Sequence, residues 1–271
     1  MEELLRAEIT RFIGNHPGNH LPDSDSPYLA EPLVGFSSAM DPLFRDYKKI
    51  IGPFHLLPAE LLSDAVSVVS WILPIGLAVR ESNRRQSDLP SREWALTRSH
   101  GEGVNGDLRR HLVKWLEEKG HGAVAPQYSP LWKEFSDTPV GIASCWSERH
   151  AAYVAGLGTF SLSDGFITSR GIAHRCGSVI TTLALSPGKR TASGHRSNCL
   201  HYFDGSCGAC IARCPVGAIT RDGHDKFRCR DLVYGTAPEK LSEMYGVPHT
   251  GCGLCQTRVP CESSIPPACR V

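Results

Sequence analysis

The sequence predicts an α/β (α+β) domain followed by a small cysteine-rich module. In the first 185 residues or so, amphipathic helical patterns alternate with a few short runs of β-branched residues. The first 140 residues contain no cysteine, whereas eight of the eleven cysteines lie between Cys199 and Cys261. Because such an abrupt change in composition indicates a domain boundary, we expect one domain over residues 1–190 and a second over residues 191–271.

Periodicity and end signals predict the elements of the first domain. The segment 66–73, VSVVSWIL, is rich in β-branched residues and ends at Pro74, which is typical of a buried strand. Asn105 is a candidate helix cap, and the apolar spacing that follows it predicts a helix over 106–119. Further helices are expected at 3–13, 40–50, 58–62 and 147–155, and further strands at 122–128 and 176–185.

Charge and hydropathy exclude several classes of protein. The chain has 271 residues and a formal net charge of +1, so its overall balance indicates neither nucleic acid nor an anionic membrane surface. It contains no run of eighteen apolar residues, and its amphipathic start, MEELLRAEITRF, lacks an apolar signal core. We therefore expect a cytoplasmic protein, in which an odd number of cysteines argues against a disulfide framework.

The segment CGACIARCP, from Cys207 to Pro215, matches most of an iron–sulfur signature. The bacterial ferredoxin pattern is C-x2-C-x2-C-x3-C-P, and the last three cysteines and the proline are present here at that spacing. Position 204, where the first cysteine would stand, is Asp. Cys199, five residues earlier, is the natural substitute, with the intervening residues forming a wider loop.

A second set of cysteines follows, at Cys229, Cys252, Cys255 and Cys261, and its last spacing is also wider than the standard. In two-cluster ferredoxins the last cysteine of each run binds the cluster of the other run. Soft thiolates suit iron–sulfur cubes. This crossing predicts two [4Fe–4S] clusters, one held by Cys199, Cys207, Cys210 and Cys261, and the other by Cys229, Cys252, Cys255 and Cys214.

Two other interpretations concern the same segment. Two C-x2-C pairs could build a structural zinc site, although four cysteines would suffice for zinc and zinc gives no reason for Pro215. Residues 187–230 also hold eight Lys or Arg against three Asp or Glu, which could indicate nucleic-acid binding. We favour a role in offsetting cluster charge, because Arg213, Arg228 and Arg230 each adjoin a predicted ligand.

The segment ERHAAYVAGLG, from Glu148 to Gly158, followed by Cys176-Gly-Ser-Val-Ile and the two cysteine runs, resembles the epoxyqueuosine reductase family, which is related to the reductive dehalogenases. The resemblance covers roughly residues 90–261, with the motifs in the same order. It implies a nitroreductase-like domain fused to a two-cluster ferredoxin-like module. It also implies a base-off cobalamin between the two, reached by electrons that a low-potential ferredoxin or flavodoxin supplies.

The resemblance also implies candidate site residues. The loop after the Glu-Arg pair occupies the place of the family's corrinoid-proximal loop, with Ser161 where glycine is usual. Glu148 and Arg149 are candidates for orienting a substrate or cofactor, and Tyr153 is a candidate for donating a proton, although an ordinary helix-start ion pair and a core tyrosine are equally compatible with the pattern. The candidate cofactor-binding residues are Gly156, Leu157, Gly158, Thr159 and Ser161.

The sequence departs from the family pattern at two places. The family's proton-donating Asp, six residues before the Glu-Arg pair, is replaced by Ile142. Cys145, inside the same segment, is a candidate catalytic residue, or else a small buried hydrophobe. The chain also ends ten residues after Cys261, whereas the tRNA-modifying members continue, so a nucleic-acid partner is not expected.

These patterns leave three hypotheses. The first is an oxidoreductase that passes electrons through two clusters to a corrinoid or another planar acceptor, with the cofactor performing the bond chemistry. The second is a non-catalytic electron carrier that reduces a partner protein. The third is a protein in which the clusters are only structural.

Overall fold

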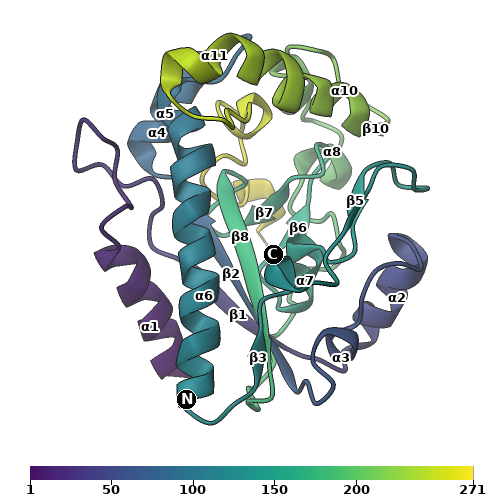
Figure 1. Cartoon of the computed structure of the whole chain (residues 1–271). Helices are drawn as coiled ribbons and strands as arrows, with labels where there is room; N and C mark the ends of the chain where they lie inside the picture. The colour runs from purple at the N-terminus through teal and green to yellow at the C-terminus, as the bar shows by residue number, and fades with distance from the viewer. Residues whose placement is uncertain (271) are drawn as a thin grey trace.

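A four-stranded antiparallel sheet in the order β1-β2-β8-β3 organises the computed structural model of the chain, which describes residues 1–270 (Figure 1). Its two central strands are long and register fully over eight residues, from Ser67 opposite Thr181 to Pro74 opposite His174. The strands of this sheet are β1 (Leu33–Ser38), β2 (Ser67–Pro74), β3 (Ala123–Val124) and β8 (His174–Thr181).

Strand β2 is buried at every position, because helices cover both faces of the sheet. Alternate side chains point to opposite faces. Trp71 and its neighbours on one face pack against helices α1 (Glu2–Asn15) and α6 (Glu102–Glu118). Val68, on the other face, packs with residues of α2 (Pro42–Ile50) and α7 (Glu148–Val154). This double burial explains why six of the eight residues of segment 66–73 are apolar.

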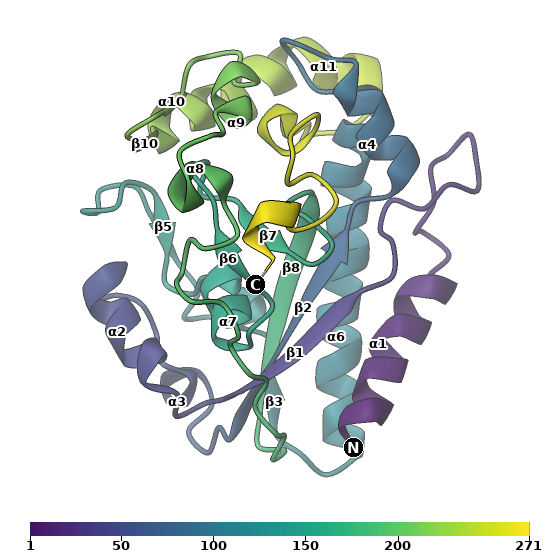
Figure 2. The same cartoon turned by 180° about the vertical axis from the view of Figure 1, so that it is seen from behind.

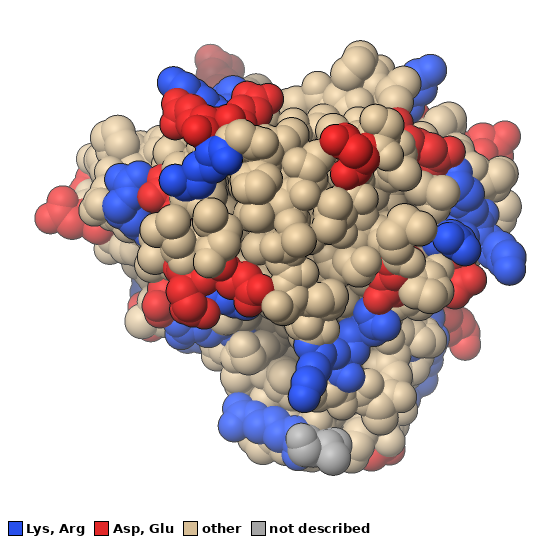
Figure 3. Space-filling model, turned by 90° about the horizontal axis from the view of Figure 1, so that it is seen from below, with Lys and Arg blue, Asp and Glu red and all other residues tan. Residues whose placement is uncertain are grey.

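The predicted helices at the start of the chain are confirmed. The expected helix 3–13 is α1, the segment 40–50 contains α2, and Pro58 opens α3 (Pro58–Leu61). No helix within residues 1–270 is both long enough and apolar enough to cross a membrane. Basic and acidic side chains are interspersed on the face shown in Figure 3, in keeping with the small net charge.

The predicted start of the long helix is wrong. Helix α6 begins at Glu102 and follows directly on α5 (Arg92–Leu96) and a five-residue π-helical stretch, so Asn105 lies inside the helix. Its side chain accepts a hydrogen bond from the indole of Trp71 at 2.8 Å and donates to the carbonyl of Cys176. Because this contact is non-local, the local capping pattern was misleading.

Two strand predictions need correction. Of segment 122–128 only Ala123–Val124 is a strand, and residues 126–128 form a 3-10 turn that opens at Pro126. Strand β8 begins at His174, two residues earlier than expected, and ends at Thr181. The sequence analysis also missed β1, whose Gly35 weakens the strand pattern. A side chain there would meet Leu157 at 2.9 Å.

The cysteine-rich segment lies over one end of the sheet, where β2 ends and β8 begins (Figures 1 and 2). It is built from short elements, which is usual for a segment organised around side-chain ligands. They are α8 (Leu200–Phe203), α9 (Ala209–Ala212), β9 (Ile219–Thr220), β10 (Gly223–His224), α10 (Lys226–Arg230), a π-helical stretch (Asp231–Thr236), α11 (Ala237–Tyr245) and two 3-10 turns (Leu254–Gln256 and Pro267–Cys269).

Helix α4 (Leu77–Arg84) holds this segment through a buried ion pair. The carboxylate of Glu262, only 5% exposed, accepts hydrogen bonds from Arg80 at 3.0 Å and from Arg84 at 2.8 Å. The buried amide of Asn83 donates to the carbonyl of Cys252. Arg213 donates hydrogen bonds to the carbonyl of Gln86, in the loop after α4, and to the carbonyls of Leu254 and Thr257, on either side of Cys255. The last cysteines are thus anchored to helix α4.

We predict that Glu262→Gln destabilises the protein, because it leaves two arginines facing a neutral amide in a buried position. The expected loss in the free energy of unfolding is about 2–4 kcal/mol, since breaking a buried pair costs more than breaking an exposed one. Denaturant unfolding of the metal-free protein measures it. Glu31→Gln is the matched control, because the Glu31–Arg170 pair is exposed and should contribute less than about 1 kcal/mol. Equal effects for the two variants would contradict the anchoring role.

Candidate functional site

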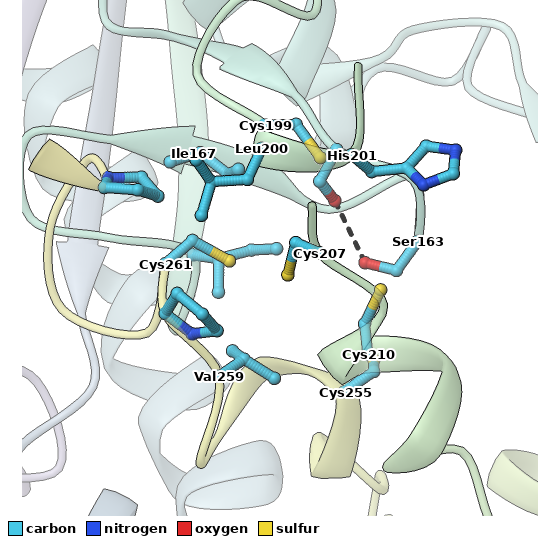
Figure 4. A pocket seen from close by; sticks show the side chains of 14 residues that line it. Ser163, Ile167, Cys199, Leu200, His201, Cys207, Cys210, Cys255, Val259 and Cys261 are labelled. Atoms are coloured by element: carbon cyan, nitrogen blue, oxygen red, sulfur yellow. Dashed lines mark hydrogen bonds between the residues drawn. The ribbon is translucent and has the colours of Figure 1, made fainter. Parts of the chain in front are cut away.

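Five of the predicted ligands line a first hollow. These are the four cysteines of the first predicted set, Cys199, Cys207, Cys210 and Cys261, together with Cys255 of the second set, and Figure 4 draws them around the same space. The rest of the wall is largely apolar, with Ile167, Ile172 and Val259 packed beside the thiols. The backbone holds Cys261 in place, because its carbonyl accepts a hydrogen bond from the amide of Ile172 at 2.9 Å.

The four cysteines of the second predicted set line a second hollow of about 230 Å³. They come from three separate parts of the chain: the end of the first cysteine run, helix α10 and the loop before the 254–256 turn. Cys255 and Ser163 line both hollows, so the two spaces adjoin. The four cysteines of the second hollow are Cys214, Cys229, Cys252 and Cys255.

The thiols of each hollow lie close to one another, and they are buried or partly buried. Burial, and then the neighbouring Cys199 and Cys207, raise the pKa of Cys210 to about 11. Burial, and then the neighbouring Cys229 and Cys214, raise the pKa of Cys252 to about 11. Within residues 1–270 no three His, Cys, Asp or Glu side chains meet at a spacing that would hold a single ion. The thiols surround the hollows instead of converging on one point.

The second hollow has a further wall that contains no cysteine. It is formed by the start of β8, with His174 and Arg175, by Arg149 of α7, and by Trp94, which comes from α5. Burial lowers the pKa of His174 to about 4, so its imidazole is neutral near pH 7. Neutral histidine and cationic arginines therefore face the second set of thiols.

A buried ion network stands behind this wall. Arg109, only 3% exposed, pairs with Glu102 at 3.0 Å and lies 3.7 Å from Glu148. Arg175 pairs with the other oxygen of Glu102 at 2.6 Å. The arginines outweigh the effect of burial and hold the pKa of Glu102 at about 2. This network fixes the position of Arg175, because its partner Glu102 is itself paired with the buried Arg109.

The candidate cofactor loop does not form one cradle. Gly156, Leu157 and Gly158 line a third hollow of about 530 Å³, on another side of α7. Thr159 is fully buried and accepts a hydrogen bond from the amide of Asn198. Ser161 lines the first hollow and bonds to Ser163 at 3.0 Å. The five residues therefore lie in three different surroundings.

The three candidate catalytic residues are also dispersed. Glu148 lines none of the three hollows. It accepts a hydrogen bond from Ser178, and burial raises its pKa. Tyr153 lines the third hollow. Cys145 is 3% exposed, and its sulfur accepts a hydrogen bond from the amide of Lys133 at 3.1 Å.

The arginines that adjoin predicted ligands make different contacts. Arg213 donates to backbone carbonyls and lies near enough to Cys252 and Cys255 to interact with their charges. Arg228 pairs with Asp225, and Arg230 pairs with Glu134 at 3.2 Å. Only Arg213 is thus both close to the thiols and held in place beside them.

Sequence reasoning missed most of the second hollow's wall without cysteines. Arg149 was considered either for orienting a substrate or cofactor or as part of a helix-start pair, and His174 and Arg175 were not singled out. A histidine and an arginine at the first two positions of a buried strand are a usable signal, because charged residues are rarely buried without a partner. Their position beside the thiols depends on contacts far apart in sequence.

The fold is shared with two groups of solved enzyme structures. Epoxyqueuosine reductase from Bacillus subtilis superposes with a TM-score of 0.54 and 18% identity, over 99% of this chain and 68% of that protein. The enzyme from Streptococcus thermophilus matches with a TM-score of 0.54 and 17% identity, over 96% of this chain and 66% of that one. The chain thus has the fold of the epoxyqueuosine reductases, as the sequence resemblance predicted.

The second group is the reductive dehalogenases. A catabolic reductive dehalogenase in complex with 3-bromo-4-hydroxybenzoic acid matches with a TM-score of 0.52 and 16% identity, over 88% of this chain and 30% of the dehalogenase. No family model matches the sequence, and no curated protein does. At these identities the comparisons establish the fold.

We predict that acidification destabilises the metal-free protein between about pH 6.5 and pH 4. Burial lowers the pKa of His55 and of His174 to about 4, from an ordinary value of 6.5. In that window the unfolded chain binds protons that the folded chain does not, so the free energy of unfolding falls as the pH falls. Denaturant unfolding at pH 7.5 and pH 5.0 measures the difference. His174→Gln should reduce it, and an unchanged pH dependence in that variant would contradict this account of His174.

Proposed function

We propose that the protein is an iron–sulfur reductase in which two [4Fe–4S] clusters pass electrons to an acceptor bound beside the second cluster. The observation that carries this proposal is that eight cysteines line two adjoining hollows, with Cys255 common to both. Four thiolates are the ligand set of such a cluster, and C-x2-C-x2-C-x3-C-P is its sequence signature.

The chemistry of the two hollows fits iron–sulfur clusters. Buried thiols with raised pKa values resist ionisation on their own, and a bound iron cluster supplies the positive charge that thiolates need. The arrangement also favours a cluster over a single zinc ion, because the thiols surround a space instead of meeting at one point. When bound, the clusters accept and release single electrons.

Three features of the chain itself would guide the electrons. Cys255 lines both hollows, so the two clusters would lie next to each other. The apolar wall of the first hollow keeps water away from its thiols. Arg149, His174 and Arg175 would orient an anionic or polar acceptor on the far side of the second hollow, since they offer donors and a neutral imidazole there.

The structure does not form a single cradle for a corrinoid. The loop residues that the family resemblance assigns to it do not share one cradle here, and the second hollow, at about 230 Å³, is smaller than the usual site for a drug-sized ligand. The reductive dehalogenase matches support a corrinoid, because one of those structures is described as suggesting a mechanism for B12-dependent dehalogenation. One of the similar epoxyqueuosine reductase structures contains a modified tRNA stem loop, and we do not extend that substrate to this protein.

A non-catalytic electron carrier is the second candidate function. The exposed side chains Phe227 and Tyr234, close in sequence to Cys229, would favour it by offering a docking surface beside the second cluster. Arg149 and Arg175, which both line the second hollow, favour the reductase, because a carrier needs no polar wall inside the hollow.

Cysteine substitutions test the cluster assignment. We predict that Cys207→Ser and Cys229→Ser each lower the iron content of anaerobically reconstituted protein from about eight to about four per chain, because each removes a ligand from a different cluster. Cys145→Ser is the matched control and should keep about eight, since Cys145 lines neither hollow. Iron that is unchanged in both ligand variants would overturn the proposal.

A corrinoid titration separates the acceptors. We predict that hydroxocobalamin added under reducing conditions leaves the corrinoid spectrum as it is in buffer, because the predicted loop does not form a cradle. A saturable spectral shift that Arg149→Ala abolishes would contradict this prediction and identify a corrinoid as the acceptor. Reduction of a partner ferredoxin without any bound acceptor would favour the carrier.

A further inference from the structure

One polar contact joins the first domain to the second set of thiols and has no part in the electron path described above. His224, on the short strand β10, lines the second hollow beside Cys229, which follows it by five residues on α10. The ring is partly buried, with 13% of its side chain exposed. Its Nδ1 lies 3.3 Å from the carboxylate of Asp164, which belongs to the turn between β6 (Gly158–Phe160) and β7 (Phe166–Thr168).

The backbone of Asp164 is held in an unusual conformation. Its φ is +55°, in the left-handed region that non-glycine residues seldom adopt. Its carbonyl accepts a hydrogen bond from Arg149, which itself lines the second hollow. Strain of this kind persists only where the surroundings enforce it, and it concentrates at functional sites. Here it turns the carboxylate toward the imidazole.

The imidazole lies between this carboxylate and a thiol. Its Nδ1 bonds to Asp164, and the ring lines the second hollow together with Cys229. The neighbouring Lys226 holds helix α10, which carries Cys229, by donating to the carbonyls of Val140 and Ile142. The ring therefore cannot turn away from the second hollow without breaking its bond to Asp164.

We propose that Asp164 and His224 form a carboxylate–imidazole pair that directs an N–H donor at the Cys229 sulfur and thereby raises the reduction potential of the second cluster. His224 is a positioning residue and donor, not a ligand. The proposal rests on the proposed function, because it requires a cluster at Cys229. A hydrogen bond to a ligand sulfur stabilises the reduced, more negative cluster more than the oxidised one.

The pair also distinguishes the two clusters. The histidine of the first hollow, His201, has a buried Nδ1 without a hydrogen-bond partner, and no carboxylate orients its ring. The second cluster would therefore have the higher potential of the two. Electrons would then collect at the cluster that faces Arg149 and Arg175, where the acceptor is proposed to bind.

Redox titration monitored by electron paramagnetic resonance tests the pair in the holoprotein. We expect His224→Phe to move one of the two midpoint potentials to a more negative value and to leave the other unchanged, with iron still at about eight per chain. Asp164→Asn should move the same midpoint in the same direction by less. His224→Gln, which keeps an N–H donor, should restore part of the shift. His111→Phe is the matched control, because His111 pairs with Glu8 between α1 and α6, away from the hollows.

Several results would overturn the inference. Unchanged midpoints in His224→Phe would remove the donor role, and unchanged midpoints in Asp164→Asn alone would remove the carboxylate's part. Loss of about four irons in His224→Phe would make the histidine a ligand instead. The iron content of the wild-type protein tests the proposed function separately. Wild-type protein that binds no iron would contradict the proposed function itself.

Discussion

The structure depends on one electrostatic constraint, which is the packing of eight buried or partly buried cysteines around two adjoining hollows. Burial first, and then the neighbouring thiols, raise the pKa of Cys210 and of Cys252. Thiolates can stay packed in this way only when positive charge lies among them. Iron–sulfur clusters would supply that charge, and the rest of the chain can be understood as the frame that holds the cysteines in place.

The frame is rigid where it meets the cysteines. The sheet buries both faces of β2, and its end carries His174 and Arg175, which form one side of the second hollow. Arg80 of helix α4 forms an ion pair with Glu262, the residue after Cys261. The amide of Ile172 donates a hydrogen bond to the carbonyl of Cys261 itself. Side chains on strands and anchored loops hold their geometry better than side chains on free loops. This would suit cysteine ligands that must keep their positions when a cluster gains or loses an electron.

Local pattern predicted much of this arrangement. Cysteine spacing predicted two sets of four ligands by the crossing of two-cluster ferredoxins. The first set, with Cys255, lines the first hollow and the second set lines the second hollow, while the binding of clusters there stays a prediction. The strand 66–73 and the helix 3–13 were predictable, since burial on one or two faces leaves a clear periodicity. The start of α6 was not, because Asn105 bonds to Trp71 across the sheet instead of capping a helix.

The walls of the site were the least predictable part. Arg149, Asp164 and His224 are far apart in sequence and meet only because the β6–β7 turn lies against β10. The candidate corrinoid loop was contiguous in sequence, yet a short strand at 158–160 turns alternate residues into different surroundings. Because these residues are contiguous in sequence, they were predicted to share one site, but the geometry of the strand separates their side chains.

Mössbauer spectroscopy of protein reconstituted with ⁵⁷Fe without oxygen tests the central claim most directly. We expect the signal of two [4Fe–4S] clusters with complete thiolate ligation, and two distinct clusters after partial reduction. Protein that takes up zinc but no iron, or a signal from a single cluster, would contradict the account.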